Sequence, residues 1–244
     1  MSFSDDEIER YARHLVLAEV GGPGQQRLKA ARVGLVGVGG VGAPAALYLA
    51  AAGVGTLRLI DHDDVALSNL QRQVAFAGAD IGRSKVEAAE ARLTALNPHV
   101  EIEAARKRLT PDNAAWVLDG CDVVIDGTDD FATRFATNAA CVAAGVPLVS
   151  GALGRWSGQV AVFRGRPCYR CLVAEAPPDA ETCARVGVVG ALAGAVGSMA
   201  ALEAVKLITG AGEPLEGRLL LYDGLAGTAR TVRLSPDPAC PVCA

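Results

Sequence analysis

Short apolar runs alternate with stretches of helical periodicity along the first 150 residues of the chain. The runs that suit buried parallel strands lie at 33–36, 56–60, 100–102, 122–126 and 147–149. The helices predicted between them span 45–52, 84–96, 111–118 and 131–144. Strands that alternate with helices in this way are typical of an α/β fold. We therefore predict a Rossmann-like, mainly parallel sheet.

The pattern changes from Gly151 onward. Three further strands are predicted at 158–163, 218–222 and 229–234, and we expect them to continue the sheet in antiparallel fashion. A long helix from about Val188 to Thr209 would pack against them. The polar, Pro-rich segment 175–181 is predicted to be a mobile loop. The chain is then one domain, 1–244, with an N-terminal half, 1–150, and a C-terminal half, 151–244.

The N-terminus carries a helix-start signal. Ser4 and Glu7 have the spacing of a capping box, and apolar residues follow at helical spacing as far as Val16. The glycine-rich segment 21–24 is predicted to break this helix. A short helix at 25–30 would lead into the first strand.

A glycine-rich turn follows that first strand. Residues 37–42 read GVGGVG and a helical stretch comes next, which gives the GxGxxG fingerprint in the order strand, turn, helix. Gly37 would permit the tight turn, Gly39 the close approach of a phosphate, and Gly42 the packing of helix against strand. Gly40 belongs to the same turn, and the following helix N-terminus favours an anion. We predict a nucleotide site here, with a structural turn as the alternative.

Polar residues past the turn extend this site. Asp61 stands at the carboxyl end of the second strand, where an acidic residue can accept hydrogen bonds from ribose hydroxyls, although it could also be a turn residue. Arg72 could clamp phosphate oxygens with two hydrogen bonds, and Lys85 could supply a point charge. Lone basic residues are usually solvated, but Lys85 opens a predicted helix, where the helix dipole disfavours a cation. Both are candidates for phosphate contacts.

The fourth strand ends in Gly127-Thr128-Asp129-Asp130. In an open α/β sheet, ligands bind beyond the carboxyl ends of the strands, at the point where the strand order reverses. We therefore expect this segment to face the glycine turn. Asp129 is placed to hold Mg²⁺ against nucleotide phosphates, whereas Asp130 is predicted to cap the following helix.

Composition excludes several classes of function. The formal net charge is −4, so no general basic surface invites nucleic acid. The N-terminal residues lack the apolar stretch of a signal peptide, and we expect a cytoplasmic protein. The uncharged segment 186–202 includes a GxxxG pattern at 190–194, but a membrane span needs about twenty predominantly apolar residues. We interpret this segment as a central helix packed closely against other backbone, and expect no membrane partner.

The seven cysteines fall into distinct groups. Two CxxC pairs lie far apart in sequence, at Cys168 and Cys171 and at Cys240 and Cys243. Four thiolates from two such pairs make a closed tetrahedral Zn²⁺ site, hence a structural zinc knuckle. Disulfides are disfavoured in the cytoplasm, and a redox CxxC would explain only one of the pairs.

The other three cysteines stand apart from these pairs. Cys121 and Cys141 lie beside apolar runs and are predicted to fill the core. Cys183 follows the predicted mobile loop. It is either an inert thiol or a nucleophile that takes over an activated acyl group, and the sequence leaves both open.

Taken together, these motifs resemble those of the adenylyltransferases of the MoeB/ThiF/HesA group, which are relatives of the ubiquitin-activating enzymes. The matching residues, spread over essentially the whole chain, are RYARH at 10–14, GVGGVG at 37–42, Asp61, SNLQRQ at 68–73, Lys85, Thr128-Asp129 and both CxxC pairs. The resemblance is slightly nearer to the molybdopterin branch. It implies that the nucleotide is ATP. It also implies that the substrate is the C-terminal glycine carboxylate of a small β-grasp sulfur-carrier protein ending in Gly-Gly, converted to an acyl-adenylate with release of pyrophosphate.

The resemblance also implies roles for individual residues. They are Asp61 for the ribose, Asn69, Arg72 and Lys85 for the phosphates, and Asp129 for Mg²⁺. Arg13 would reach the triphosphate held by a neighbouring subunit, which implies a homodimer. The half 151–244 would bind the carrier and the structural zinc. The rhodanese domain of some relatives does not follow the zinc knuckle, so we expect a separate sulfur donor.

Two other functions would share parts of this pattern. An NAD(P)-dependent reductase would use the glycine turn and Asp61, but would leave Arg72, Lys85, Asp129 and the zinc knuckle without a common purpose. A non-catalytic partner-binding scaffold would keep the fold and the zinc. In an adenylyltransferase the basic residues and Mg²⁺ would stabilise the charge that builds on the phosphoryl oxygens, and an ionised carboxylate needs no general base.

Overall fold

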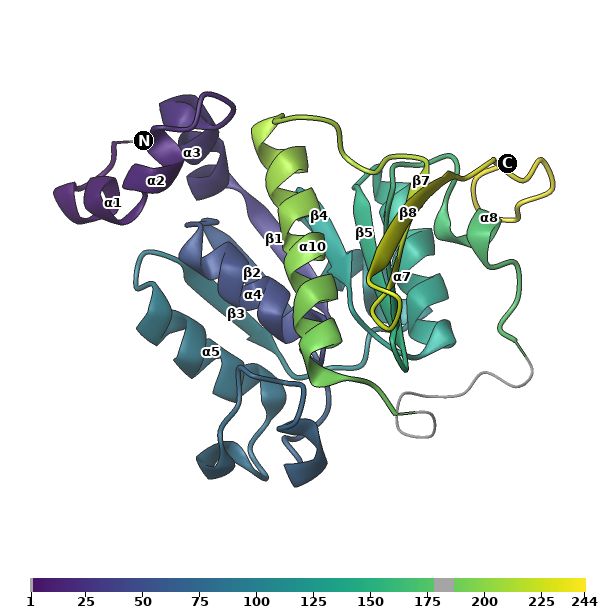
Figure 1. The fold of residues 1–244 in the computed structure, drawn as a ribbon, viewed down its shortest axis with the longest axis horizontal. Helices are drawn as coiled ribbons and strands as arrows, with labels where there is room; N and C mark the ends of the chain where they lie inside the picture. Colours follow the sequence, from purple (N-terminus) through teal and green to yellow (C-terminus); the bar gives the residue numbers. More distant parts are fainter. Residues whose placement is uncertain (1, 178–186) are drawn as a thin grey trace.

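A sheet of eight strands runs through the centre of the computed structural model, which describes residues 2–177 and 187–244 (Figure 1). The strands stand in the order β3-β2-β1-β4-β5-β6-β7-β8. The parallel part consists of β1 (Arg32–Val36), β2 (Thr56–Ile60), β3 (Glu101–Ala105), β4 (Val123–Asp126) and β5 (Leu148–Gly154). The antiparallel part consists of β6 (Ser157–Phe163), β7 (Arg218–Asp223) and β8 (Thr228–Arg233). The predicted parallel sheet with an antiparallel continuation is confirmed.

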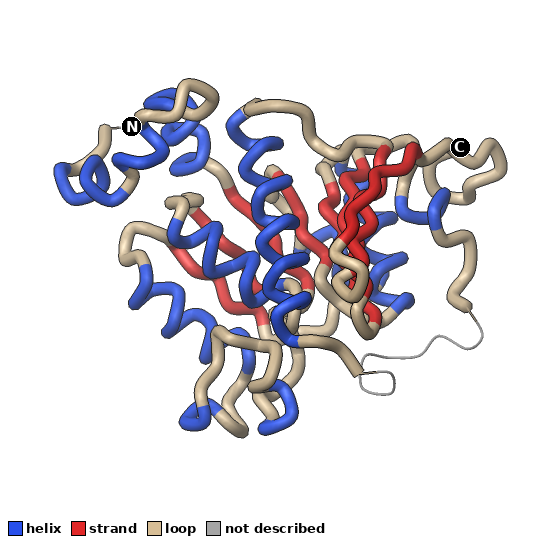
Figure 2. The backbone as a smooth tube through the Cα atoms, in the orientation of Figure 1, coloured by secondary structure: helices blue, strands red, loops and turns tan. Residues whose placement is uncertain are grey.

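Helices cover both faces of this sheet (Figure 2). One core lies under α4 (Gly42–Ala51), α5 (Lys85–Leu96) and α10 (Gly190–Thr209), and the other under α6 (Pro111–Val117) and α7 (Phe131–Ala144). Strand β4 contributes to both, because Val123 and Ile125 point to the first core and Val124 to the second. Burial on both faces explains why the central strands read as continuous apolar runs.

An N-terminal arm of three helices lies at the amino ends of the strands. They are α1 (Asp5–Arg10), α2 (Ala12–Leu15) and α3 (Gly21–Ala30). The predicted capping box is present, since Ser4 Oγ accepts from the Glu7 backbone N–H at 3.2 Å and Glu7 Oε2 accepts from the Ser4 N–H at 2.9 Å. The helix is interrupted at Tyr11, whose hydroxyl accepts from Asn97 Nδ2 at 2.9 Å.

The predicted helix break at 21–24 is wrong. These residues form the first turn of α3, and the non-helical connection lies just before them. Pro23 fits there because the first backbone N–H groups of a helix have no partner within the helix. Proline and glycine therefore mark a helix start here and not a helix end.

Among the described residues, α10 is the one helix long and apolar enough to cross a membrane, and 44% of its most apolar stretch is buried within the protein. A Cβ added to Gly197 would lie 2.4 Å from the Val41 carbonyl oxygen, and one on Gly190 would lie 2.2 Å from the Gln71 oxygen. Close packing against other backbone is thus confirmed. The glycines that permit it are Gly190 and Gly197, because a Cβ on Gly194 would meet open space.

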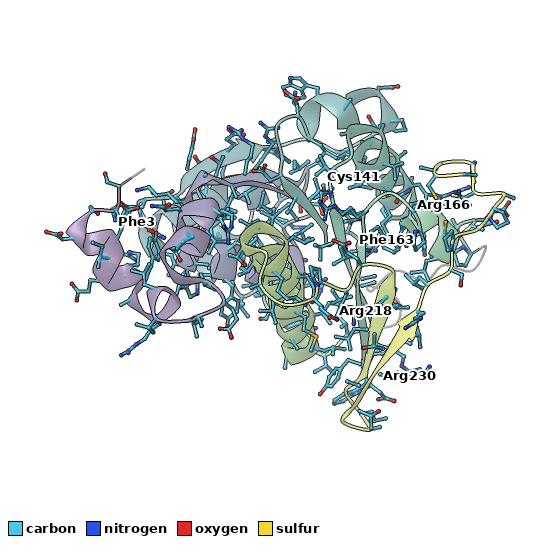
Figure 3. The ribbon with its side chains drawn as sticks, turned by 90° about the horizontal axis from the view of Figure 1, so that it is seen from above. Phe3, Cys141, Phe163, Arg166, Arg218 and Arg230 are labelled. Carbon is cyan, nitrogen blue, oxygen red and sulfur yellow. The ribbon has the colours of Figure 1, made fainter. Side chains whose placement is uncertain are left out.

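The remaining elements complete the two ends of the molecule. The connection after β2 contains the short 3-10 helices η1 (Leu67–Asn69) and η2 (Gly78–Asp80), and α8 (Tyr169–Leu172) follows β6. Figure 3 places the N-terminal arm with Phe3 at one end and the β7–β8 hairpin with Arg218 and Arg230 at the other. Cys183 and the second half of the predicted loop 175–181 lie outside the described residues.

Candidate functional site

A cavity of about 440 Å³ lies beyond the carboxyl ends of β1 and β4. These two strands are neighbours in the sheet although β2 and β3 separate them in sequence, so the strand order reverses between them. The predicted site residues that line the cavity are Gly37, Gly39, Gly40, Asp61, Asn69, Arg72, Lys85 and Asp129. The structure therefore brings the predicted nucleotide-binding residues together at the predicted place.

The glycine turn forms the floor of this cavity. Gly37 has φ +82°, and a Cβ on Gly42 would lie 1.8 Å from the Gly37 carbonyl oxygen, so both positions require glycine for the turn itself. A Cβ on Gly39 would meet only the Gln73 side chain at 3.5 Å, an ordinary contact. Packing of the protein thus leaves room at Gly39, on the side where a phosphate would approach.

Asp61 ties this turn to the end of β2. Its Oδ2 accepts from the Val38 backbone N–H at 2.9 Å, and its Oδ1 accepts from the Asp63 N–H at 2.9 Å. The carboxylate is buried and lines the cavity. Each oxygen can accept a second hydrogen bond, so the predicted contact with ribose hydroxyls is chemically open to it.

Lys85 is the first residue of α5 and is only 6% exposed. Its Nζ lies 2.8 Å from Asp63 Oδ2, an ion pair that the sequence analysis missed although Asp63 stands two residues after Asp61. Burial alone would raise the pKa of Asp63, but the hydrogen bond and the charge of Lys85 outweigh it and hold that pKa below its ordinary value. The ion pair therefore holds the Lys85 ammonium group in place beside the cavity.

Arg72 and Asn69 lie on the segment around η1. Arg72 Nη1 donates to the Ser68 carbonyl oxygen at 2.9 Å, and Asn69 Oδ1 accepts from the Ala66 N–H at 3.0 Å. The neighbouring Gln73 is buried, and its Oε1 has no hydrogen-bond partner within the described part of the chain. Gln73 lines the cavity, so this unpaired oxygen could accept a hydrogen bond from a bound ligand.

The loop after β4 presents Asp129 to the cavity. Asp126 Oδ1 accepts from the Thr128 N–H at 2.9 Å, and Asp130 Oδ2 accepts from the Thr133 N–H at 3.1 Å, so the loop is held on both sides of Asp129. The predicted N-cap role of Asp130 is confirmed. An exposed carboxylate at the wall of this cavity fits the ligand preference of Mg²⁺.

Arg13 does not line this cavity. Arg13 is exposed on α2, which is part of the N-terminal arm. This arm contacts the amino end of β2, where the Gly55 N–H donates to the Leu28 carbonyl oxygen of α3 at 2.9 Å. The cavity is lined by residues at the opposite, carboxyl ends of the strands, among them Val36 and Ile60. Figure 1 shows the N-terminal arm at the other end of these strands. Within one chain Arg13 and the cavity are thus separate, and its role in a neighbouring subunit stays a prediction.

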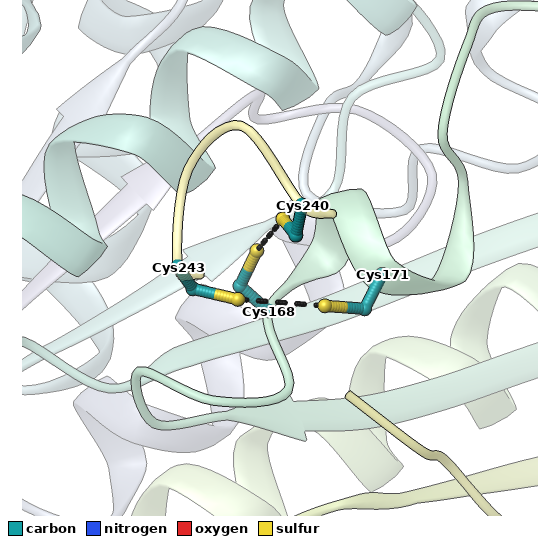
Figure 4. A group of neighbouring side chains, drawn as sticks. All are labelled: Cys168, Cys171, Cys240 and Cys243. Carbon is teal, nitrogen blue, oxygen red and sulfur yellow. Dashed lines mark hydrogen bonds between the residues drawn. The ribbon is translucent and has the colours of Figure 1, made fainter. Parts of the chain in front are cut away.

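The four CxxC thiols meet beside α8 (Figure 4). The sulfur atoms of Cys168 and Cys240 are 3.6 Å apart and those of Cys171 and Cys243 are 3.4 Å apart, and all four lie within 4.8 Å of one another. A tetrahedral site with Zn–S bonds of about 2.3 Å needs sulfur atoms about 3.8 Å apart. The described thiols therefore fit a Zn²⁺ ion.

Neighbouring groups support this cluster. Asn138 Nδ2 donates to the Cys168 sulfur at 3.5 Å, and its Oδ1 accepts from the Tyr169 N–H at 2.8 Å. Burial alone would raise the pKa of Cys240, but hydrogen bonds from backbone N–H groups and the neighbouring thiols outweigh it and lower that pKa to about 7, whereas burial raises the pKa of Cys168 and Cys243. Burial likewise raises the pKa of Cys121 to about 11 and also raises that of Cys141, as expected for core thiols.

Comparisons with known proteins agree with this arrangement. The profile of the ThiF family matches residues 11–242. The chain belongs to the ThiF family. It is 46% identical over 252 residues to the sulfur carrier protein adenylyltransferase of Thermus thermophilus, covering 100% of this chain and 93% of that protein. It is 44% identical over 243 residues to the molybdopterin-synthase adenylyltransferase of Escherichia coli, covering 98% of each.

Solved structures share the fold. MccB of Escherichia coli, solved with MccA-N7isoASN, superposes with a TM-score of 0.86 at 21% identity, covering 99% of this chain and 75% of that one. PaaA superposes with a TM-score of 0.83 at 25% identity, covering 95% of this chain and 75% of that one. The family and its named relatives make this chain an enzyme of the adenylyltransferase class, as the sequence predicts.

Proposed function

We propose that this adenylyltransferase uses ATP and Mg²⁺ to activate the C-terminal glycine carboxylate of a small β-grasp sulfur-carrier protein. The observation that carries the proposal is the single cavity shared by the glycine turn, Arg72, Lys85 and Asp129. The names of the Thermus thermophilus and Escherichia coli relatives support the substrate class. A homodimer and a separate sulfur donor belong to the same proposal.

Each residue of the site has a separate role in this proposal. The turn at Gly39 leaves room for a phosphate, and Asp61 would accept from the ribose. Lys85 and Arg72 would stabilise the negative charge that builds on the phosphoryl oxygens while the carboxylate displaces pyrophosphate. Mg²⁺ held by Asp129 would neutralise further phosphate charge when bound. The thiolates of the knuckle would hold Zn²⁺ in a structural role.

Exchange of labelled pyrophosphate into ATP tests this proposal. We expect exchange to require Mg²⁺ and a carrier that ends in Gly-Gly, measured against a panel of such carriers. The matched control is each carrier with its last glycine removed, which should support no exchange. Tight binding of NAD without binding of ATP, measured by calorimetry, would instead favour a reductase.

A further inference from the structure

A buried arginine on α7 takes no part in the mechanism above. Arg134 is 4% exposed and lines the cavity. It forms no ion pair with any residue that the structure describes. Buried charges are normally paired, because desolvation of an isolated charge is costly. The contacts of this guanidinium group therefore need an explanation.

Those contacts join two walls of the cavity. Nη2 donates to the Gly151 carbonyl oxygen at 2.7 Å and to the Thr128 carbonyl oxygen, and Nη1 donates to Ser150 Oγ at 3.1 Å. Ser150 and Gly151 belong to β5, whereas Thr128 directly precedes Asp129. One rigid, planar group thus fixes the spacing between β5 and the Asp129 loop.

The same arginine also meets the cysteine cluster. Its guanidinium carbon lies 5.7 Å from the centre of the Tyr169 ring, and Tyr169 stands between Cys168 and Cys171 in the sequence. One turn further along α7, Asn138 bonds to both Cys168 and the Tyr169 backbone. Helix α7 therefore presents Arg134 to the cavity and Asn138 to the zinc knuckle.

We propose that Arg134 is a positioning residue that holds the Asp129 loop at the right distance from β5 for Mg·ATP binding. This role rests on the proposed function, since it acts through Asp129 and Mg²⁺. The Asp130 cap fixes the loop on one side of Asp129, and Arg134 fixes it on the other through the Thr128 carbonyl. Arg134 donates its hydrogen bonds to neutral carbonyl and hydroxyl oxygens. We therefore expect it to fix the distance between β5 and the Asp129 loop and not to neutralise a charge.

Calorimetry of ATP binding at increasing Mg²⁺ concentration, without carrier, tests the role separately from catalysis. Arg134→Lys keeps the charge but loses the two-pronged geometry. We expect the half-saturating Mg²⁺ concentration to rise about tenfold, the usual cost of losing a group that orients a metal ligand. In an Asp129→Ala background the same substitution should change Mg²⁺ dependence less than about twofold, because the residue through which it acts is gone.

The matched control is Arg58→Lys. Arg58 also donates to main-chain carbonyls, those of Val117 and Asp119, and it lies outside the cavity. We expect this variant to lose some thermal stability with an unchanged Mg²⁺ dependence. Both lysine variants should retain the zinc content of the wild type.

Several outcomes would overturn the positioning role. An unchanged Mg²⁺ requirement in Arg134→Lys is one, and an equal effect with and without Asp129 is another. If Arg134→Lys does not fold, Arg134→Gln is measured instead, and failure of both to fold would make Arg134 a purely structural residue. Wild-type protein that binds Mg·ATP but supports no exchange with any carrier would contradict the proposed substrate while leaving this role intact. Wild-type protein that binds no Mg·ATP would overturn both.

Discussion

Most residues predicted to contact the nucleotide are already held by other parts of the protein. Asp61 is fixed by two backbone N–H groups and Lys85 by its ion pair with Asp63. Asp129 differs, because its side chain makes no hydrogen bond or ion pair with any described residue. A carboxylate that no described residue pairs with, on a loop held at both ends, is suited to take its partner from a ligand.

Replacing Lys85 or Asp129 with alanine should abolish carrier-dependent pyrophosphate exchange, because each substitution removes charge stabilisation in the transition state. Loss of one such group typically costs about 100- to 1,000-fold in rate. Circular dichroism and thermal melting should show a folded protein in both cases. Exchange at the wild-type rate in either variant would remove that residue from the proposed mechanism.

The residue types of the site are predictable from the sequence, but their partners in the folded protein are not. Lys85 was recognised because a cation at a helix N-terminus is unusual, yet its partner Asp63 lies on the far side of the η1 and η2 segment, whose path no local pattern predicts. Arg134 was missed because an arginine within a helix is ordinary in sequence. Its burial becomes visible only when β5 and the Asp129 loop are placed around it.

At the scale of elements, the glycine turn was predictable almost residue by residue, because its requirements are local. The positive φ of Gly37 and the close approach of Gly42 to the Gly37 carbonyl follow from the strand–turn–helix geometry itself. The arm containing α3 was predicted less well. Glycine and proline signal both the end and the start of a helix, and only the structure shows that residues 21–24 form a first turn.

The glycines of this turn should therefore respond differently to alanine. Gly39→Ala should change the free energy of unfolding by less than about 1 kcal/mol, since its Cβ would make only an ordinary contact with Gln73, but should weaken Mg·ATP binding at least tenfold. Gly42→Ala should destabilise the fold severely, because its Cβ would lie 1.8 Å from a carbonyl oxygen. Thermal melting and calorimetry measure both effects, and equal Mg·ATP binding by wild type and Gly39→Ala would contradict a phosphate contact there.

For the whole molecule, the cysteine cluster joins two segments that lie far apart in the sequence. Cys168 and Cys240 are 72 residues apart, and the chain between them includes α10, β7 and β8. The sequence predicted the ligands from their spacing within each pair. It could not predict Asn138, because that residue lies on α7, 30 residues before Cys168, and no spacing rule connects the two.

Removal of zinc should destabilise the C-terminal half. Structural zinc sites contribute on the order of 10 kcal/mol, so chelation or a Cys171→Ser, Cys243→Ser double variant should lower the melting temperature markedly. Metal analysis should find about one zinc per chain in the wild type and none in the double variant. Cys121→Ala serves as the control, because it alters a buried thiol outside the cluster and should keep its zinc. Zinc-free wild-type protein with an unchanged melting temperature would contradict a structural site.

The proposed homodimer makes a mixing experiment possible. Arg13→Ala and Lys85→Ala should each be inactive in pyrophosphate exchange, because one site loses the neighbour's arginine and the other its own lysine. Co-refolding equal amounts should restore about a quarter of wild-type activity, since half of the dimers are mixed and each of these holds one intact site. Absence of any recovery, with mixed dimers shown by native mass spectrometry, would contradict a contribution of Arg13 across subunits.

The 72 residues between Cys168 and Cys240 also determine when the metal site can form during synthesis of the chain. During synthesis at about 5 to 20 residues per second, the second pair is made roughly 4 to 14 seconds after the first. Over that interval the strands of the parallel sheet and the helix bearing Arg134 and Asn138 can already be assembled, while Cys168 and Cys171 still lack half of their metal site. Metal capture would then be a late event in the synthesis of this enzyme, after the glycine turn and the strand ends that line the cavity have been made.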